Sequence, residues 1–299
     1  MKKLILIDGS GLIYRGFYAI PPFLKAPDGT QTNAVFGFTN ILISLLANQK
    51  PDYLAVALDK KGPTFRHKEY KEYKATRIKA PQELYDQIPL VKTVIETFSI
   101  PLFENEGYEA DDILATIVKK TSNEKNLQIF IATGDFDVFQ VIGPKVFILY
   151  PSKGFKEADI LRTEDIRAKY GFSPEQIPDY KGLAGDSSDN IPGVFGIGNK
   201  GATELIQKYK NLENIYKHLD EIKGSLHQKL VEGKTSALMS KWLATLDSNT
   251  PVDFDLALCR VKNFNAEAVR KLFEKLGFKS LQKRLDELFS VHYSQNTLF

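Results

Sequence analysis

Cysteine and histidine are scarce in this chain, which has one cysteine and four histidines among its 299 residues. The single Cys259 excludes an internal disulfide and a thiolate zinc cluster, and the scattered histidines lack the spacing of zinc ligands. Any bound metal must therefore be held by carboxylates.

Long hydrophobic runs are also missing from the sequence. The apolar residues 4–7 are too few for the core of a signal peptide, and no run approaches the length of a membrane span. We therefore expect a cytoplasmic protein with no membrane partner.

The bulk composition is that of a folded globular protein, with 43% hydrophobic and 26% charged residues. The length permits one large domain or two smaller ones. A net charge of +3 says little about nucleic acid, because the placement of basic residues matters more than their total.

Three short apolar runs end at aspartates. Residues 3–7, 53–58 and 127–132 lead to Asp8, Asp59 and Asp135, and residues 146–149 indicate a fourth strand. Helical periodicity between the runs predicts an α/β fold with a mostly parallel sheet flanked by helices. Ligands bind outside the carboxyl ends of such strands, so three aspartates there indicate a common site.

Two acid clusters lie within residues 103–139. Glu109, Asp111 and Asp112 precede a helix-like run, and Asp135 and Asp137 follow a strand-like run. Carboxylates within about 4 Å of each other repel by roughly 4 kcal/mol per pair, so convergence requires cations, and oxygen ligands favour hard divalent metals. Taken alone, the acids could instead complement a helix dipole and form a turn.

Residues 60–79 form a strongly basic stretch. Eight Lys or Arg stand against Glu69 and Glu72, giving a net charge of +6, and Phe65, Tyr70 and Tyr73 are interleaved without a helical apolar stripe. A solvated charged helix is one interpretation. In a clamp for single-stranded nucleic acid, stacking contributes about 1–3 kcal/mol per base and the cations neutralise phosphates. We favour the clamp because acidic strand ends flank the stretch on both sides.

From residue 151 onward the periodicity is almost wholly helical. Asp186 and Asp189 lie in a turn-forming segment, and glycines at 193, 196 and 198 follow at once. Backbone N–H groups at a tight hairpin between helices can hold a phosphate without reading sequence. Because no strand precedes these glycines, a nucleotide cofactor is not expected.

Together these motifs resemble the 5′ nuclease (5′-3′ exonuclease) domain of bacterial DNA polymerase I, within the flap endonuclease family. The resemblance covers roughly residues 4–254. It implies a PIN-like α/β nuclease domain over residues 1–180, with a basic helical arch at about 60–98. A helical DNA-binding region over 181–299 would contain a helix-hairpin-helix at about 190–210.

The resemblance implies two divalent ions, Mg²⁺ or in its place Mn²⁺, roughly 4 Å apart. The nine matching positions are Asp8, Asp59, Glu109, Asp111, Asp112, Asp135, Asp137, Asp186 and Asp189. The resemblance assigns one ion mainly to Asp8, Asp59, Glu109 and Asp111, and the other mainly to Asp135, Asp137, Asp186 and Asp189. Asp112 lies between these two sets.

The resemblance also assigns contacts to DNA. Lys74, Arg77 and Arg15 would contact the scissile phosphate, and Tyr73 and Tyr14 would stack on bases. Gly193, Gly196, Gly198 and Lys200 would grip duplex DNA in the hairpin, where carbonyls of Val194 and Ile197 would hold a potassium ion. Phe136 departs from the pattern, because relatives commonly carry a basic residue there.

The implied activity is hydrolysis of phosphodiester bonds near the 5′ end of flapped or nicked DNA, in primer removal and repair. The alternatives are a DNA-structure-binding module without catalysis and a related ribonuclease. The last five residues resemble a sliding-clamp-binding peptide: Gln295, Asn296, Thr297, Leu298 and Phe299. We further expect a monomer that works with a fused or separate DNA polymerase.

Overall fold

The computed structural model describes residues 1–261 and 264–296, and a six-stranded sheet forms its centre. The sheet has the order β3-β2-β1-β4-β5-β6, and all neighbours run parallel except β6, which is antiparallel to β5. The predicted mostly parallel sheet is confirmed. The strands are β1 (Lys2–Asp8), β2 (Tyr53–Ala57), β3 (Leu102–Phe103), β4 (Leu127–Ala132), β5 (Val146–Tyr150) and β6 (Asp159–Leu161).

Helices alternate with these strands and then take over the chain. In the first half they are α1 (Gly9–Ala19), α2 (Asn33–Gln49), α3 (Phe65–Glu69), α4 (Gln82–Tyr85), α5 (Ile88–Thr97), α6 (Ala110–Lys120) and the 3₁₀ turn η1 (Asp137–Val141). Later come η2 (Phe155–Glu157), α7 (Thr163–Tyr170), η3 (Pro174–Gln176), α8 (Ile177–Ala184), α9 (Asn199–Tyr209), α10 (Leu212–Lys217), η4 (Leu219–Glu221), α11 (Gly224–Ala244), α12 (Ala266–Leu276) and α13 (Lys279–Asn296).

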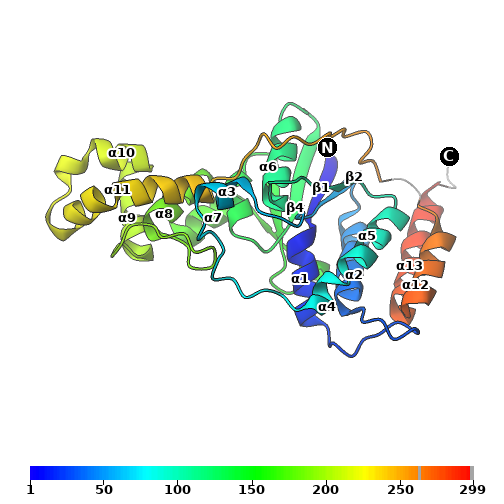
Figure 1. Ribbon diagram of the computed structural model, residues 1–299. Helices are drawn as coiled ribbons and strands as arrows, with labels where there is room; N and C mark the ends of the chain where they lie inside the picture. Colours follow the sequence, from blue (N-terminus) through cyan, green and yellow to red (C-terminus); the bar gives the residue numbers. More distant parts are fainter. Residues whose placement is uncertain (262–263, 297–299) are drawn as a thin grey trace.

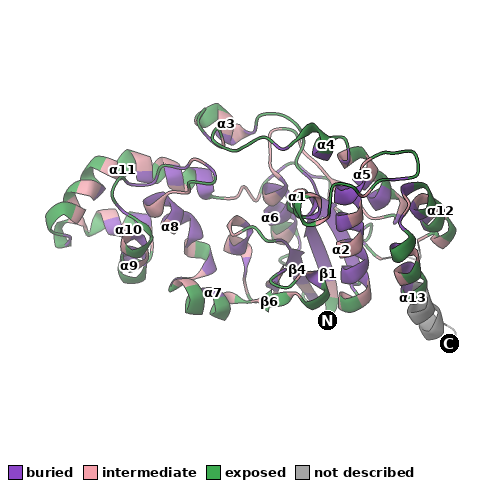
Figure 2. Ribbon diagram, turned by 90° about the horizontal axis from the view of Figure 1, so that it is seen from below, coloured by how far each residue is buried: buried purple, intermediate pink, exposed green. Residues whose placement is uncertain are grey.

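The central strands are buried on both faces. In β1, Leu4 and Leu6 belong to one hydrophobic cluster, and Ile5 and Ile7 to the cluster on the opposite face. Because side chains alternate along a strand, a continuous apolar run fills both faces, as covered parallel sheets require. Figure 2 shows the buried strands β1 and β4 between α6 on one side and α2 on the other.

The helical regions lie at the two ends of the molecule. Helices α8 to α11 extend from one end, and α12 and α13 lie at the other beside α2 and α5 (Figure 1). The amphipathic α12 buries Val269, Phe273 and Leu276, and Arg284 of α13 donates to Ser44 Oγ of α2 at 2.9 Å. The predicted clamp-binding peptide begins at the end of α13, and its residues 297–299 lie outside the described residues.

The predicted helical arch at about residues 60–98 is helical in three separate pieces. These are α3, the four-residue α4 and α5, and residues 71–77 between α3 and α4 form a series of turns in which Lys74 has a left-handed φ of 56°. The segment connects the α11 end of the molecule to α1 (Figure 1). Repulsion among its many cations opposes a continuous helix, and the backbone of Lys74 instead donates to Asp189 O at 2.9 Å.

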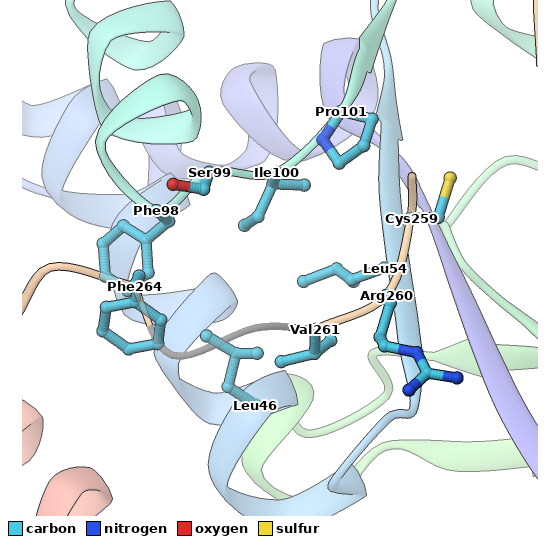
Figure 3. A pocket seen from close by; sticks show the side chains of 10 residues that line it. All are labelled: Leu46, Leu54, Phe98, Ser99, Ile100, Pro101, Cys259, Arg260, Val261 and Phe264. Atoms are coloured by element: carbon cyan, nitrogen blue, oxygen red, sulfur yellow. The ribbon is translucent and has the colours of Figure 1, made fainter. Parts of the chain in front are cut away.

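A small cavity lies where the chain after α11 returns to the sheet (Figure 3). Leu54 N donates to Cys259 O at 2.7 Å, which joins this segment to β2. The cavity beside the join measures about 10 Å³ and is lined by apolar groups such as Leu46 and Phe98. That volume holds one water at most, so it offers no ligand site.

Within residues 1–261 and 264–296, no helix has both the length and the hydropathy of a membrane span.

Candidate active site

Three neighbouring strands end at the acids that the sequence singled out. Because β2, β1 and β4 are adjacent and parallel, Asp59, Asp8 and Asp135 meet at one edge of the sheet. Asp8 is held in place, since its carboxylate accepts from Gly11 N at 2.9 Å and from Thr133 Oγ1 at 2.8 Å. The predicted convergence of strand ends is what the fold produces.

The amino end of α6 brings two more carboxylates to this edge. Ala110 N donates to Asp59 Oδ1 at 2.7 Å, which places Glu109 and Asp111 beside the strand ends. A groove of about 520 Å³ runs between these acids and the basic stretch. Five of the nine predicted ligands line it: Asp8, Asp59, Glu109, Asp111 and Asp135.

Burial, together with repulsion from neighbouring carboxylates, raises the pKa of two of these acids. Burial, with added repulsion from Asp135 and Asp59, raises the pKa of Asp8 to about 7. Burial and the neighbouring carboxylates Asp135, Asp8 and Asp59 raise the pKa of Asp111 well above its usual value. The crowding that raises these two pKa values and the presence of oxygen donors alone fit a site for hard divalent cations.

A second acid group lies beside the first. Asp137, at the start of η1, meets Asp186 and Asp189 from the loop after α8, and the three offer ligand oxygens within 4.8 Å of one another. Burial and repulsion from Asp135 outweigh the nearby Lys181 and raise the pKa of Asp137 to about 6. These three residues are the ones that the resemblance groups, with Asp135, around the second ion.

Residues 73–77, within the predicted arch, contact acids of both groups. Lys74 Nζ lies 2.7 Å from Glu109 Oε1 and 3.8 Å from Asp189 Oδ2. Arg77 also pairs with Asp189, and the Tyr73 hydroxyl lies 3.2 Å from Glu109 Oε2 and 3.3 Å from Asp189 Oδ2. Burial opposes ionisation of Glu109, but Lys74 and Arg66 lower its pKa below the usual value. Lys74 and Arg77 therefore place positive charge against acids of both groups.

The predicted roles of the arch residues require them to leave these positions. Lys74 and Arg77 must exchange their carboxylate partners for phosphates. Tyr73 is only 3% exposed, so its ring is not accessible for stacking on a base in this conformation. The assigned phosphate contacts and the stacking of Tyr73 stay predictions.

Asp112 occupies a different environment from the other acids. Its side chain is fully buried, and its two oxygens accept from Arg66 Nη1 and Nη2 at 2.8 and 2.7 Å. The oxygens also accept from Asp247 N at 2.8 Å and Glu109 N at 3.1 Å. With both oxygens engaged, the geometry favours a positioning role for Asp112 over direct ligation of an ion.

Tyr14 and Arg15 of α1 point to different surroundings. Tyr14 is partly exposed and lines the groove together with Tyr85. Arg15 Nη2 donates to Pro151 O at 2.9 Å. Stacking by Tyr14 is compatible with its exposure, whereas a phosphate contact by Arg15 requires it to give up that carbonyl.

The helix-hairpin-helix predicted at about residues 190–210 falls on α9 and on the loop at residues 185–198 that joins α8 to α9. Gly193 and Gly196 adopt positive φ values of 64° and 78°, and a Cβ on Gly193 would lie 2.3 Å from Gly185 N, so the tight turn requires glycine. Gly198 immediately precedes α9, and Lys200 is exposed at its first turn. Val194 and Ile197 are buried, and Val194 O accepts from Ile197 N at 3.0 Å.

Three residues that support the site were not predicted. Thr133 is buried and connects Asp8 to Asp135, whose N donates to Thr133 Oγ1 at 3.0 Å. Arg66 anchors Asp112, and Lys181 contacts Asp137 and Asp186. The sequence offered one signal for Thr133, which is its position just before Gly134 and Asp135 at the end of a strand. Nothing in the sequence distinguished Arg66 and Lys181 from other basic residues.

Known proteins and family models match this chain over nearly its whole length. Models of the 5′-3′ exonuclease match it twice, as the N-terminal resolvase-like domain over residues 3–171 and as the C-terminal SAM fold over residues 172–267. DNA polymerase I of Caldicellulosiruptor bescii is 44% identical over 285 residues, covering 95% of this chain and 33% of that protein. DNA polymerase I of Bacillus subtilis is 41% identical, covering 96% of this chain and 32% of its own.

Solved structures share the fold at lower identity. The T5 5′-exonuclease with bound zinc has a TM-score of 0.67 at 22% identity, covering 97% of this chain and 99% of its own. The catalytic core of Rad2 in complex with DNA substrate has a TM-score of 0.64 at 18% identity, covering 96% and 92%.

The extent of these matches decides the family. The first model alone covers more than half of the chain, and the relatives align along nearly all of it, although the chain spans only about a third of their length. The chain therefore belongs to the 5′-3′ exonuclease family.

Proposed function

We propose that this chain is a divalent-metal-dependent 5′-3′ exonuclease and flap endonuclease, which hydrolyses phosphodiester bonds near the 5′ end of flapped or nicked duplex DNA. One observation carries the proposal: acids from three adjacent strand ends and from α6 converge in a groove that a strongly basic segment borders. Carboxylates alone would repel DNA, so the pairing of acids with cations favours a metal-dependent nuclease.

We assign the proposed ligands to two ions. Asp8, Asp59, Glu109 and Asp111 would hold one ion, and Asp137, Asp186 and Asp189 the other, with Asp135 beside both groups. Bound divalent ions, for which we propose Mg²⁺ with Mn²⁺ as a substitute, would lower the pKa of an attacking water and offset charge on the leaving oxygen.

The remaining residues would handle the DNA. Lys74, Arg77 and Arg15 would neutralise the phosphate at the cleaved bond once they leave their present partners. The partly exposed Tyr14 would stack on a base. The hairpin at residues 185–198 and Lys200 would hold the duplex backbone, with a potassium ion at its carbonyls.

We place the chemistry in residues 1–180 and the duplex grip in residues 181–299, including the helix-hairpin-helix at 190–210. A DNA polymerase, fused or separate, is the proposed partner in primer removal and repair, because the relatives are DNA polymerases I. A monomeric state, a cytoplasmic location and clamp binding through the last five residues complete the proposal.

Cleavage of a labelled 5′-flap duplex by the purified chain tests this function. With Mg²⁺ we expect multiple turnovers and products cut near the flap junction, and with excess chelator no cleavage. Filter binding in Ca²⁺ should report DNA affinity separately. Binding without Mg²⁺-dependent cleavage would favour the DNA-structure-binding module, and preference for an RNA strand without a duplex would favour a ribonuclease.

A further inference from the structure

Lys181 places an ammonium group against the second acid group. It lies on α8, five residues before Asp186, and its side chain is only 7% exposed. The ammonium contacts one oxygen of Asp137 and one of Asp186, which are two members of the three-acid group completed by Asp189. Thus a protein cation contacts two carboxylates that the proposed function gives to a metal ion.

A divalent ion and this ammonium would compete for the same two carboxylates, Asp137 and Asp186. Two cations held by the same pair of carboxylates repel each other strongly in a partly buried site, where water screens them weakly. An ion that enters the group must therefore displace the ammonium. Conversely, without an ion the ammonium offsets the repulsion among the three carboxylates and keeps them together.

We propose that Lys181 is a positioning residue that serves as a resident counter-ion of Asp137 and Asp186 and gives way when a divalent ion binds. The inference rests on the proposed metal site. This role has two consequences. The three carboxylates stay together in the absence of metal, and they bind metal more weakly than they would without Lys181.

The structure offers the displaced ammonium a second position. Lys181 Nζ lies 5.9 Å from the ring centroid of Phe136, at the edge of cation–π range. Phe136 is fixed by Tyr170 and Phe139, with ring centroids 4.8 and 5.5 Å away. Rotation of the flexible lysine stem can bring the ammonium onto this ring, so displacement does not leave the charge without a favourable contact.

Lys241 provides a matched control within the same region. It also bridges two carboxylates, Asp179 at 2.7 Å and Glu213 at 2.8 Å, but neither belongs to either acid group of the groove. Removing it should lower stability without changing metal affinity. A comparison of the two lysines therefore separates the loss of a two-carboxylate bridge from the loss of a competing cation.

The experiment is calorimetric titration of Mn²⁺ into the metal-free full chain, with thermal melts in chelator and in Mn²⁺. For Lys181→Met we expect the weaker class of sites to bind about tenfold more tightly, because one competing positive charge is gone. The melting temperature in chelator should fall, and the rise caused by Mn²⁺ should exceed that of the wild type. Lys181→Arg, which keeps the charge, should stay closer to the wild type.

The controls distinguish a failure of the counter-ion role from a failure of the proposed metal site. Lys241→Met should melt earlier in chelator but bind Mn²⁺ as the wild type does. Equal or weaker Mn²⁺ binding by Lys181→Met would overturn the counter-ion role while leaving the proposed nuclease function in place. A wild-type chain that binds no Mn²⁺ would overturn the metal site, and the inference with it.

Discussion

Substitution of Asp135 by alanine is expected to lower Mg²⁺-dependent cleavage by about 10³-fold or more while DNA affinity changes little. Asp135 follows β4 and lines the groove with Asp8 and Asp59, and its Oδ1 accepts from Asp137 N at 2.8 Å. Its loss therefore affects both acid groups at once. Removing a negative charge from a DNA-facing groove should not weaken binding.

Single-turnover cleavage and Ca²⁺-supported binding measure the two effects separately. Asp159→Ala is the matched control, because Asp159 is an exposed aspartate at the start of β6. We expect this variant to cleave as the wild type does. Cleavage retained in Asp135→Ala would remove Asp135 from the metal site.

Substitution of Arg66 by methionine should cause the largest loss of stability, about 3–5 kcal/mol, because it leaves the buried Asp112 without a counter-charge. Arg66 is 1% exposed and also donates to the carbonyls of Leu243 and Thr245 at 2.8 and 2.9 Å. The side chain thus ties α3 to α6 and to the end of α11. Urea unfolding in chelator measures the change in the free energy of unfolding.

Two further variants separate this buried pair from ordinary surface charge. Arg270→Met removes an exposed ion pair with Asp286 and should cost less than about 1 kcal/mol. The double variant Arg66→Met with Asp112→Asn should be less destabilised than the sum of its single changes, because no buried charge is left unpaired. Additive effects would mean that Arg66 and Asp112 stabilise the fold independently.

The sheet and its acids could be predicted because their signals are local. A buried parallel strand appears in the sequence as a short apolar run, and the aspartates that follow β1, β2 and β4 mark the carboxyl ends directly. Because these strands are adjacent and parallel, Asp8, Asp59 and Asp135 lie close together at one edge of the sheet.

The arch could not be predicted in the same way, because tertiary contacts determine its shape. A family resemblance implied a helix around Lys74, but the described chain has turns there, held by ion pairs to Glu109 and Asp189 that lie far along the sequence. Those pairs depend on how the acids converge. Local propensity contains no information about them.

The helical character expected from residue 151 onward is present in the structure, for example in the strongly amphipathic α12, because an apolar stripe at helical spacing is a local signal. Lys181, by contrast, was not predicted. A lysine near the end of a helix is usually a solvated charge, and only the three-dimensional structure shows that its ammonium is buried between Asp137 and Asp186.

The convergence of acids on a pair of ions is tested most directly by a crystal structure of the chain soaked in Mn²⁺, with anomalous scattering measured at the manganese edge. We expect two peaks about 4 Å apart, one near Asp8, Asp59 and Asp111 and the other near Asp137, Asp186 and Asp189. Peaks elsewhere, or none at an Mn²⁺ concentration that supports cleavage, would contradict the two-metal site.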